Sequence, residues 1–164
     1  MKYADIVNLF YERSRIKFFV FENVPEILAR KNKGFLDGLR ANLSKNFEIY
    51  EREMNASEFG VAQLRRRYFI VGIDRGLLKE EFNFPEPNNK DDRKVVADMI
   101  AGLPEPAYYA HNLMPADIPH HQNHWTMRPK SKRFLTGDMP SGGRSFIKLE
   151  WDKPSRTVAY GNRE

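Results

Sequence analysis

The sequence of 164 residues contains no cysteine, which excludes disulfide bonds, thiolate metal sites and a cysteine nucleophile within these residues. No apolar run approaches the roughly 20 residues that cross a bilayer, and the start lacks the apolar segment and cleavage site of a secretion signal. Hydrophobic residues make up 41% and charged residues 30%, a mixture typical of a folded globular chain. These features predict a cytoplasmic protein of one domain, or of one domain with a small lobe.

Positive charge is in slight excess and is unevenly distributed. Residues 1–75 carry 14 basic and 10 acidic side chains, residues 76–105 carry 4 and 7, and residues 106–164 carry 9 and 5. The acidic block includes residues 84–89, Phe-Pro-Glu-Pro-Asn-Asn, a cluster typical of a loop. We therefore expect a boundary between two regions here. The net charge of +5 permits a polyanionic partner without requiring one.

The first region alternates helical and strand patterns. Apolar spacing predicts helices over 3–10 and 35–43, buried strands over 16–21 and 68–73, and a further strand over 47–54. Pro25 suits the first turn of a helix that follows the first strand. This order predicts an α/β layer architecture, in which ligands usually bind at the carboxyl ends of the strands.

The second region is less regular. Apolar residues over 95–103 predict one helix, with Asp91 or Asp92 near its start. Residues 104–143 are rich in proline, histidine, glycine and basic residues, which indicates loops. Residues 144–160 return to short apolar pieces.

Charged side chains flank both predicted buried strands. Glu22 directly follows the first strand, where partial burial would let its carboxyl group hold a proton near neutral pH; an ordinary polar cap is the simpler explanation. Arg65 and Arg67 should share a face and Arg66 should point away, because strand side chains alternate. Two guanidinium groups beside a carboxylate suit a planar, hydrogen-bonding, anionic ligand, although a solvated basic strand edge explains the arginines equally well.

Three ordered segments carry a family resemblance. They are residues 19–25, Phe-Val-Phe-Glu-Asn-Val-Pro; residues 55–72, with Gln63-Leu64-Arg65-Arg66-Arg67 at their centre; and Arg144-Ser145-Phe146 followed by residues 151–158, Trp-Asp-Lys-Pro-Ser-Arg-Thr-Val. They resemble the Glu-Asn-Val block, the Gln-x-Arg-x-Arg block and the block that closes the target-recognition region in the DNA (cytosine-5) methyltransferases. Ala62 stands where that family usually has proline. The resemblance spans nearly the whole chain.

The resemblance implies an α/β fold made of a partial Rossmann-like methyltransferase sheet and a small, irregular target-recognition region. Residues 1–76 would be the carboxyl-terminal half of the catalytic domain, residues 77–143 the target-recognition region, and residues 144–164 a closing segment that returns toward the catalytic domain. The family's Gly-rich cofactor loop, Pro-Cys motif and final block are absent. We therefore expect most of the S-adenosylmethionine pocket to be missing and the lone chain to be inactive. A second chain would have to supply the cofactor loop and cysteine.

The resemblance also implies a reaction. The family transfers a methyl group to carbon 5 of a cytosine extruded from duplex DNA, after a cysteine adds to carbon 6. By position, Glu22 would contact ring nitrogen 3 and the exocyclic amine, and Arg67 would hold the base carbonyl oxygen. Arg65 would support the carboxylate, the attacking group or a nearby phosphate. Gln63 and Asn23 would be positioning residues, with Asn23 fixing the turn that presents Glu22.

A basic stretch over 121–148 is expected to contact double-stranded DNA. Its charges are Arg128, Lys130, Lys132, Arg133, Arg144 and Lys148 against Asp138. Phosphate contacts supply affinity but little sequence information. Candidates for reading base edges are Gln122, Asn123, His124 and Arg128. A solvated loop with scattered charge is the alternative.

The histidine cluster at His120, His121 and His124, with His111 and Asp117 upstream, suggests zinc. Structural zinc sites usually include thiolates, and none is available here, so we expect no bound metal.

Three hypotheses about function follow. In the first, the chain is part of a cytosine-5 DNA methyltransferase from a restriction–modification or orphan methylation system. The second is a non-catalytic DNA-binding recognition module or degenerate relative, and the third is a fragment without an independent role. Half a sheet would expose an edge and an apolar face, which predicts marginal stability or self-association unless a partner covers them.

Overall fold

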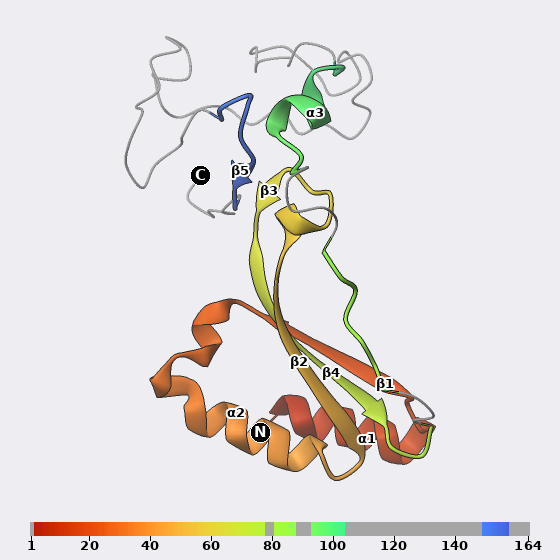
Figure 1. The fold of residues 1–164 in the computed structure, drawn as a ribbon. Coiled ribbons are helices and arrows are strands. Elements are labelled where there is room, and N and C mark those ends of the chain that lie inside the picture. Colours follow the sequence, from red (N-terminus) through yellow and green to blue (C-terminus); the bar gives the residue numbers. More distant parts are fainter. Residues whose placement is uncertain (1, 78–80, 88–92, 104–148, 158–164) are drawn as a thin grey trace, which may run out of the picture.

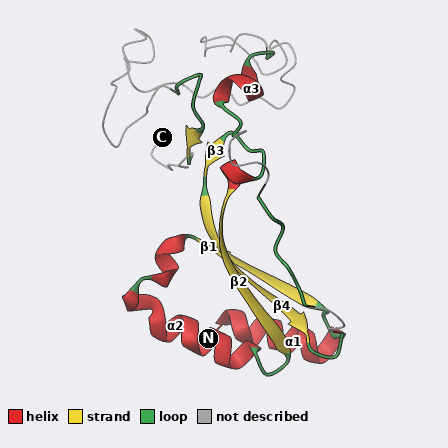
Figure 2. Cartoon of the chain, in the orientation of Figure 1, coloured by secondary structure: helices red, strands yellow, loops and turns green. Residues whose placement is uncertain are grey.

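The computed structural model describes residues 2–77, 81–87, 93–103 and 149–157 (Figure 1). The main body contains α1 (Lys2–Ser14), β1 (Phe18–Asn23), α2 (Lys33–Leu43), β2 (Phe47–Asn55) and β4 (Arg66–Asp74). Three 3₁₀ turns are η1 (Pro25–Leu28), η2 (Arg30–Asn32) and η3 (Ala56–Glu58). The short elements β3 (Gln63–Leu64), α3 (Val96–Ile100) and β5 (Ser155–Arg156) lie at the opposite end of the long strands from α1 and α2 (Figure 2).

The helices and strands predicted for the first region are confirmed, with ends that shift by a few residues. Pro25 begins a helix as expected, although this helix is the four-residue 3₁₀ segment η1 and not an α-helix. The prediction of a mixed α/β layer is confirmed for these elements.

The main sheet has the order β1-β4-β2, and both pairings are antiparallel. Residue pairs across it include Glu22 with Phe69 and Met54 with Arg67. Because β1 and β4 run in opposite directions, the carboxyl end of β1 lies beside the amino-terminal part of β4. This topology brings the predicted carboxylate and the predicted arginines to one place.

One face of the sheet packs against α1 and α2 to form the core. The core residues are Ala4, Val7, Phe19, Leu36, Leu39, Leu43, Phe47, Tyr68 and Ile70. The rings of Phe19 and Phe47 meet edge to face with centroids 5.1 Å apart. Gly72 lies beneath the Phe19 ring, so closely that an added Cβ would stand 2.0 Å from Phe19 Cε1. Glycine is therefore required here by the close approach of an aromatic ring.

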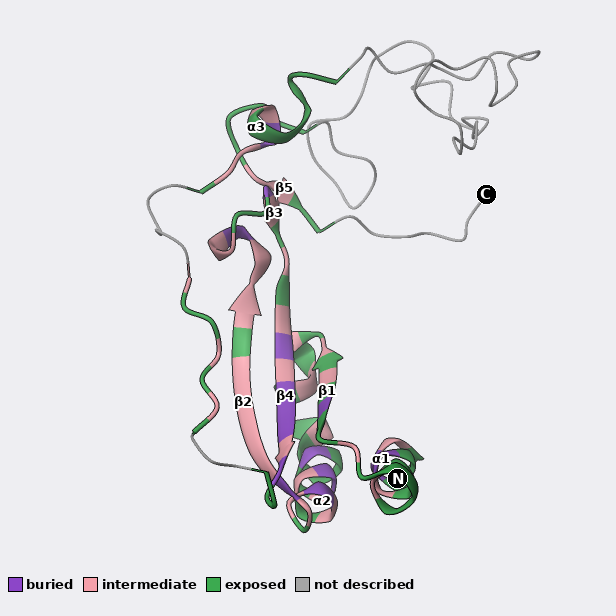
Figure 3. Cartoon of the chain, turned by 90° about the vertical axis from the view of Figure 1, so that its right-hand side faces the viewer, coloured by how far each residue is buried: buried purple, intermediate pink, exposed green. Residues whose placement is uncertain are grey.

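The opposite face of the sheet carries no helix among the described residues (Figure 3). On β1, Phe19 is 6% exposed, whereas its neighbours Phe18 and Val20 are 62% and 50% exposed. The prediction that this strand is buried on both faces is therefore wrong for the described structure, because α1 and α2 cover only one face. Strand alternation then places every second apolar side chain of β1 in the open.

The second region is anchored to the first by backbone pairing. β3 and β5 pair in parallel, with Gln63 opposite Ser155 and Leu64 opposite Arg156. The backbone N–H groups of Val96 and Ala97 donate to the carbonyl oxygens of Lys153 and Trp151 at 3.1 and 3.0 Å. Segments more than 50 residues apart in sequence therefore meet beside β3.

The helix predicted over 95–103 is shorter than expected, since α3 covers Val96–Ile100 only. Asp98 caps its start by accepting a hydrogen bond from the backbone N–H of Val95 at 2.8 Å. The expected acidic residues Asp91 and Asp92 lie outside the described residues. Among the described residues, Asp98 of the helix itself supplies this cap.

Candidate active site

Glu22 and Arg67 form an ion pair on the open face of the sheet. Arg67 Nε lies 2.7 Å from Glu22 Oε1. The pair is diagonal across neighbouring strands, since Glu22 stands opposite Phe69, and long side chains span such diagonals. The side chain of Arg67 is 16% exposed and that of Glu22 is 47% exposed. The guanidinium is thus held by its surroundings, while the carboxylate is open to a ligand.

The arginine cluster divides between the two sides of the strand, as its spacing predicts. Arg65 Nη2 lies 4.0 Å from Glu22 Oε1, at the limit of an ion pair. Arg66 points the other way and pairs with Glu53 of β2. Arg67 also donates from Nη1 to its neighbour's carbonyl oxygen, Arg66 O, at 2.8 Å. Two guanidinium groups therefore converge on one carboxylate oxygen, and the third stabilises the pairing of β2 with β4.

The partial burial expected for Glu22 agrees with the described structure, in which its side chain is 47% exposed. The strand that carries it is at the edge of the sheet, and its side chain projects from the uncovered face. Both guanidinium groups approach Oε1, and 47% of the Glu22 side chain remains exposed to a ligand. A carboxyl group flanked by guanidinium donors presents acceptors and donors side by side, the pattern that complements the hydrogen-bonding edge of a pyrimidine.

The two predicted positioning residues lie in different elements: Asn23 ends β1 beside Glu22, and Gln63 lies in β3. Asn23 Oδ1 accepts a hydrogen bond from the backbone N–H of Val24 at 2.8 Å, so its side chain braces the turn that follows Glu22. Gln63 lies in β3, where it is half-buried and pairs with Ser155. β5 is thus joined to the chain two residues before Arg65.

Asn55 is a site residue that the sequence reasoning missed. Its Oδ1 accepts hydrogen bonds from the backbone N–H groups of Arg65 at 3.0 Å and Ser57 at 3.4 Å. The backbone N–H of Ala56 also donates to Arg65 O at 3.0 Å. Asparagine is a common residue at the start of such turns because its side chain mimics a backbone acceptor. This preference for turns was the signal in the sequence that could have pointed to Asn55. In the structure, Asn55 positions the backbone of Arg65.

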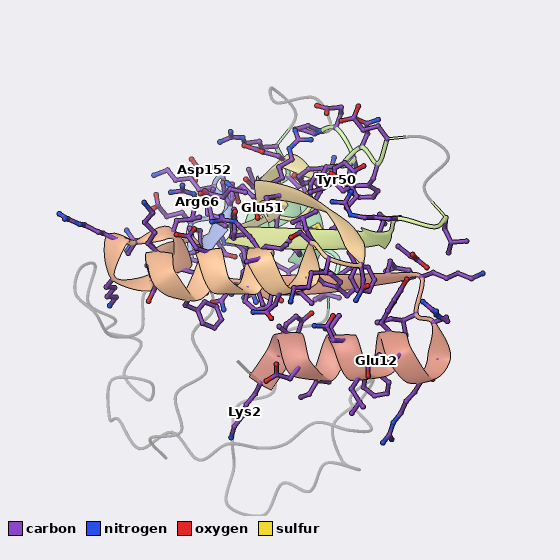
Figure 4. All side chains as sticks on the ribbon, turned by 90° about the horizontal axis from the view of Figure 1, so that it is seen from below. Lys2, Glu12, Tyr50, Glu51, Arg66 and Asp152 are labelled. Carbon is purple, nitrogen blue, oxygen red and sulfur yellow. The ribbon has the colours of Figure 1, made fainter. Side chains whose placement is uncertain are left out.

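A second polar cluster lies on the covered face and was also missed. Arg40 of α2 donates from Nε to Glu51 Oε1 at 2.7 Å and from Nη2 to Glu51 Oε2 at 2.8 Å. The hydroxyl of Tyr68 donates to the same carboxylate. The hydrogen bonds from Arg40 lower the pKa of Glu51, and burial raises the pKa of Tyr68. Glu51 sits where α2 meets the sheet (Figure 4), so the cluster links α2 to β2 and to β4.

The residues predicted to bind DNA lie outside the described residues. They are Gln122, Asn123, His124, Arg128, Lys130, Lys132, Arg133 and Arg144. The histidines considered for zinc lie in the same range. In the part of the chain that the structure describes, no group of three acidic, histidine or cysteine side chains is placed to hold a metal ion. None of the helices described there is both long enough and apolar enough to span a bilayer.

Comparison with known proteins identifies the family. The model of the C-5 cytosine-specific DNA methylases matches residues 3–153. The chain belongs to this family. It is 29% identical over 164 residues to the Type II methyltransferase M.FnuDI of Fusobacterium nucleatum, covering 95% of this chain and 46% of the relative. It is 31% identical over 163 residues to M.MthTI of Methanothermobacter thermautotrophicus, covering 98% of this chain and 45% of the relative.

A solved structure supports the same fold. A crystal structure described as a DNA modification methyltransferase encoded within an E. coli prophage superposes with a TM-score of 0.52 at 26% identity. The superposition covers 60% of this chain and 28% of that protein. The resemblance to cytosine-5 methyltransferases and the partial methyltransferase fold are therefore confirmed. The chain spans about half the length of these curated relatives.

Proposed function

We propose that this chain is the base-holding and target-reading part of a DNA (cytosine-5) methyltransferase that acts on duplex DNA in the cytoplasm. The reaction would move a methyl group from S-adenosylmethionine to carbon 5 of an extruded cytosine. The observation that carries this proposal is the 2.7 Å contact between Arg67 Nε and Glu22 Oε1 on an open face, within a chain of this family. The Type II methyltransferases among its relatives support the same activity.

The roles of the site residues follow from the chemistry of the base. Carbon 5 of cytosine is a poor nucleophile until a thiolate adds to carbon 6. Glu22 would hold a proton at ring nitrogen 3 and accept from the exocyclic amine, which withdraws electrons from the ring during that addition. Arg67 would donate to the carbonyl oxygen and stabilise its negative charge. Arg65 would steady the Glu22 carboxylate or a nearby phosphate.

The methyl donor does not fit the residues present. Residues 2–77 contain no glycine-rich turn between a strand and a helix, the feature that usually cradles nucleotide-like cofactors. The nucleophile is also missing, because the sequence has no cysteine. We therefore assign no contact with S-adenosylmethionine to this chain. Both groups would come from polypeptide outside the 164 residues, on the same chain or on a second one.

The proposed roles fall on three consecutive segments of the chain. Residues 1–76 would form the catalytic part, residues 77–143 would read DNA, and residues 144–164 would close the recognition region. Pairing of β5 with β3 supports the last assignment, since it returns residues 155–156 to the neighbourhood of Arg65. The basic stretch would hold phosphates, and Gln122, Asn123, His124 and Arg128 would reach base edges.

A chimeric enzyme tests the proposal. The 164 residues would replace the matched region of the Methanothermobacter relative, and transfer of labelled methyl groups to duplex DNA would be measured. We expect Glu22→Gln and Arg67→Ala each to lower the rate by about 100-fold or more, because each removes a group that stabilises the reacting ring.

Arg66→Ala is the matched control for the chimera. It removes the adjacent arginine, which also belongs to an ion pair but lies on the other side of the strand. We expect the Arg66→Ala rate to stay within about threefold of the parent rate, since surface ion pairs contribute little. Equal losses from Arg66→Ala and Arg67→Ala, or full activity of Glu22→Gln, would contradict the proposal.

The second candidate is a DNA-binding module that methylates nothing. The absence of cysteine favours it for the lone chain. Both candidates predict duplex binding that weakens steeply with salt, so the chimera separates them: a recognition module would bind DNA without any methyl transfer. Methyl transfer by the unmodified lone chain would overturn our assignment of the nucleophile to other polypeptide.

A further inference from the structure

Tyr68 lies on the covered face of the sheet, at the level where Glu22 and Arg67 form their ion pair on the open face. It follows Arg67 directly in β4 and precedes Phe69, the register partner of Glu22. Its own register partner in β1 is Asn23, the residue after Glu22. Because successive strand residues point to opposite faces, Tyr68 stands beneath the ion pair and belongs to the backbone pairing that holds both of its members.

The Tyr68 side chain is held at its hydroxyl group. The hydroxyl donates to the carboxylate of Glu51 and accepts from Arg40 Nη2 at 3.3 Å. The side chain of Arg40 is 36% exposed and that of Glu51 is 21% exposed. Three elements, α2, β2 and β4, therefore meet at one phenol oxygen. We call Arg40, Glu51 and Tyr68 the Arg40 cluster.

Stability alone does not explain polar groups at this place. Elsewhere on the covered face, the sheet contributes apolar residues to the core, such as Phe19, Phe47 and Ile70. Apolar side chains in place of a buried ion pair are often neutral or stabilising. Apolar contacts are non-directional, whereas hydrogen bonds restrict both distance and angle. The Arg40 cluster therefore restricts the position of β4 more narrowly than apolar packing would.

The cluster also restrains the segment that follows Glu22. That segment runs through η1 and η2 into α2, and Asn32 Nδ2 braces it by donating to Glu26 O at 3.0 Å. Arg40 lies in α2 and Tyr68 lies in β4. Their contact therefore connects the two parts of the chain that present Glu22 and Arg67.

We infer that the Arg40 cluster sets the geometry of the Glu22–Arg67 pair, with Tyr68 as a positioning residue for methyl transfer. This inference rests on the proposed function, in which the pair holds the extruded cytosine. Small displacements of groups that orient a reacting molecule lower the rate steeply. The residues proposed to bind phosphates lie in a different part of the chain, over 121–148. Loss of the cluster should therefore lower kcat and leave DNA binding unchanged.

The chimera measures this effect with two tyrosine variants. Tyr68→Phe removes the hydroxyl and keeps the ring in the core, and we expect kcat to fall about tenfold through misplacement of the pair. The KM for duplex DNA should stay within about twofold, because phosphate contacts dominate that affinity. Tyr11→Phe is the matched control, since the Tyr11 hydroxyl donates to Asp74 Oδ1 at 3.2 Å at the other end of β4. Its kcat should stay within about twofold of the parent value, because it lies away from the reacting groups.

Arg40→Lys breaks the cluster from its helical end. An ammonium group cannot bind both Glu51 oxygens in the way that the planar guanidinium does. Because groups in one hydrogen-bond network are not additive, Arg40→Lys combined with Tyr68→Phe should lower kcat no further than the more damaging single substitution. Losses of kcat that multiply would mean that the two residues act separately, and would overturn the inference.

Nuclear magnetic resonance of the 164-residue chain tests the inference without the reaction. Arg67 Nε lies 2.7 Å from Glu22 Oε1, so its nitrogen-15 signal reports the ion pair. Loss of that signal in Arg67→Lys identifies it, and Glu22→Gln shows where it moves when the pair is broken. We expect Tyr68→Phe to shift the signal toward its position in Glu22→Gln. Tyr11→Phe should leave the signal at its wild-type position.

Each result decides the inference. An unchanged Arg67 signal in Tyr68→Phe, or equal kcat values for the two tyrosine variants, would overturn it. A change in KM alone would assign Tyr68 to DNA binding and would also overturn it. If the parent chimera transfers no methyl group, the proposed function is refuted and the Arg67 signal alone decides the positioning role. An active chimera that Tyr68→Phe leaves unchanged would refute the positioning role and keep the function.

Discussion

The two faces of the main sheet use the same kinds of side chain in opposite ways. On the covered face, Tyr68 is 6% exposed and shares the Glu51 carboxylate with Arg40. On the open face, the adjacent residue Arg67 contacts Glu22, which is 47% exposed. One strand thus presents a closed charge cluster on one side and an open one on the other.

The difference shows what makes a charged pair available for function. Both oxygens of Glu51 accept hydrogen bonds from protein donors, and this cluster stabilises the packing of α2 on the sheet. The Glu22 side chain, by contrast, is 47% exposed beside Arg65 and Arg67. Satisfied polar clusters rigidify a fold, whereas a charged pair whose carboxylate stays exposed can bind a ligand.

The largest expected contrast between the faces is in the free energy of unfolding. Leu39 is fully buried beneath the sheet, and Leu39→Ala should lower that free energy by about 2–5 kcal/mol through lost burial and a cavity. Phe18 is 62% exposed on the open face, and Phe18→Ala should change it by no more than about 0.5 kcal/mol. Urea denaturation followed by circular dichroism measures both. Equal losses would mean that the open face is packed in the lone chain.

The next contrast is between two glycines: Gly72 of β4, which lies against the ring of Phe19, and Gly34 of α2, which has free space around it. Gly72→Ala would place a Cβ 2.0 Å from the ring of Phe19, which is itself buried, so we expect a loss of about 1–3 kcal/mol through overpacking. Gly34 of α2 has no atom within 4 Å of such a Cβ. Gly34→Ala should therefore be neutral or stabilising by up to about 0.5 kcal/mol, because alanine is the better helix former. A Gly72→Ala variant as stable as the parent would place Phe19 outside the core.

The smallest expected contrast is the pH dependence of stability from the closed cluster. Hydrogen bonds from Arg40 lower the pKa of Glu51 below its usual value of 4.5. A carboxylate whose pKa is depressed on folding stabilises the protein above its unfolded pKa, and this stabilisation disappears as the pH falls through the folded pKa. Glu51→Gln should lower the free energy of unfolding by about 1 kcal/mol at pH 7. The difference from wild type should shrink steadily below pH 4.5.

Thermal melting of both proteins between pH 3 and 7 measures this trend. Asp37→Asn is the control, since Asp37 also contacts Arg40, at 3.2 Å, but is 53% exposed. A constant difference between wild type and Glu51→Gln across the range would contradict a stabilising role for the Glu51 carboxylate.

Local patterns predicted much of the fold and part of the site. Apolar spacing located α1, α2 and the three strands, because burial of one stripe or face requires that periodicity. The opposite directions of Arg66 and Arg67 followed from strand alternation alone. The Arg40 cluster was missed because its partners lie 11 to 28 residues away, and no local pattern encodes such distances. Asn55 offered only the general preference of asparagine for turns.

The amino-acid order therefore specified which segments are helices and strands, which arginines share a side, and the family to which the chain belongs. Strand order and direction placed Glu22 beside Arg67 and left β1 at an edge of the sheet. These features follow from packing between distant segments, since antiparallel pairing joins the end of one strand to the start of another. Residue types near position 22 suffice to suggest the chemistry, but only the assembled sheet brings the carboxylate and the guanidinium within 2.7 Å.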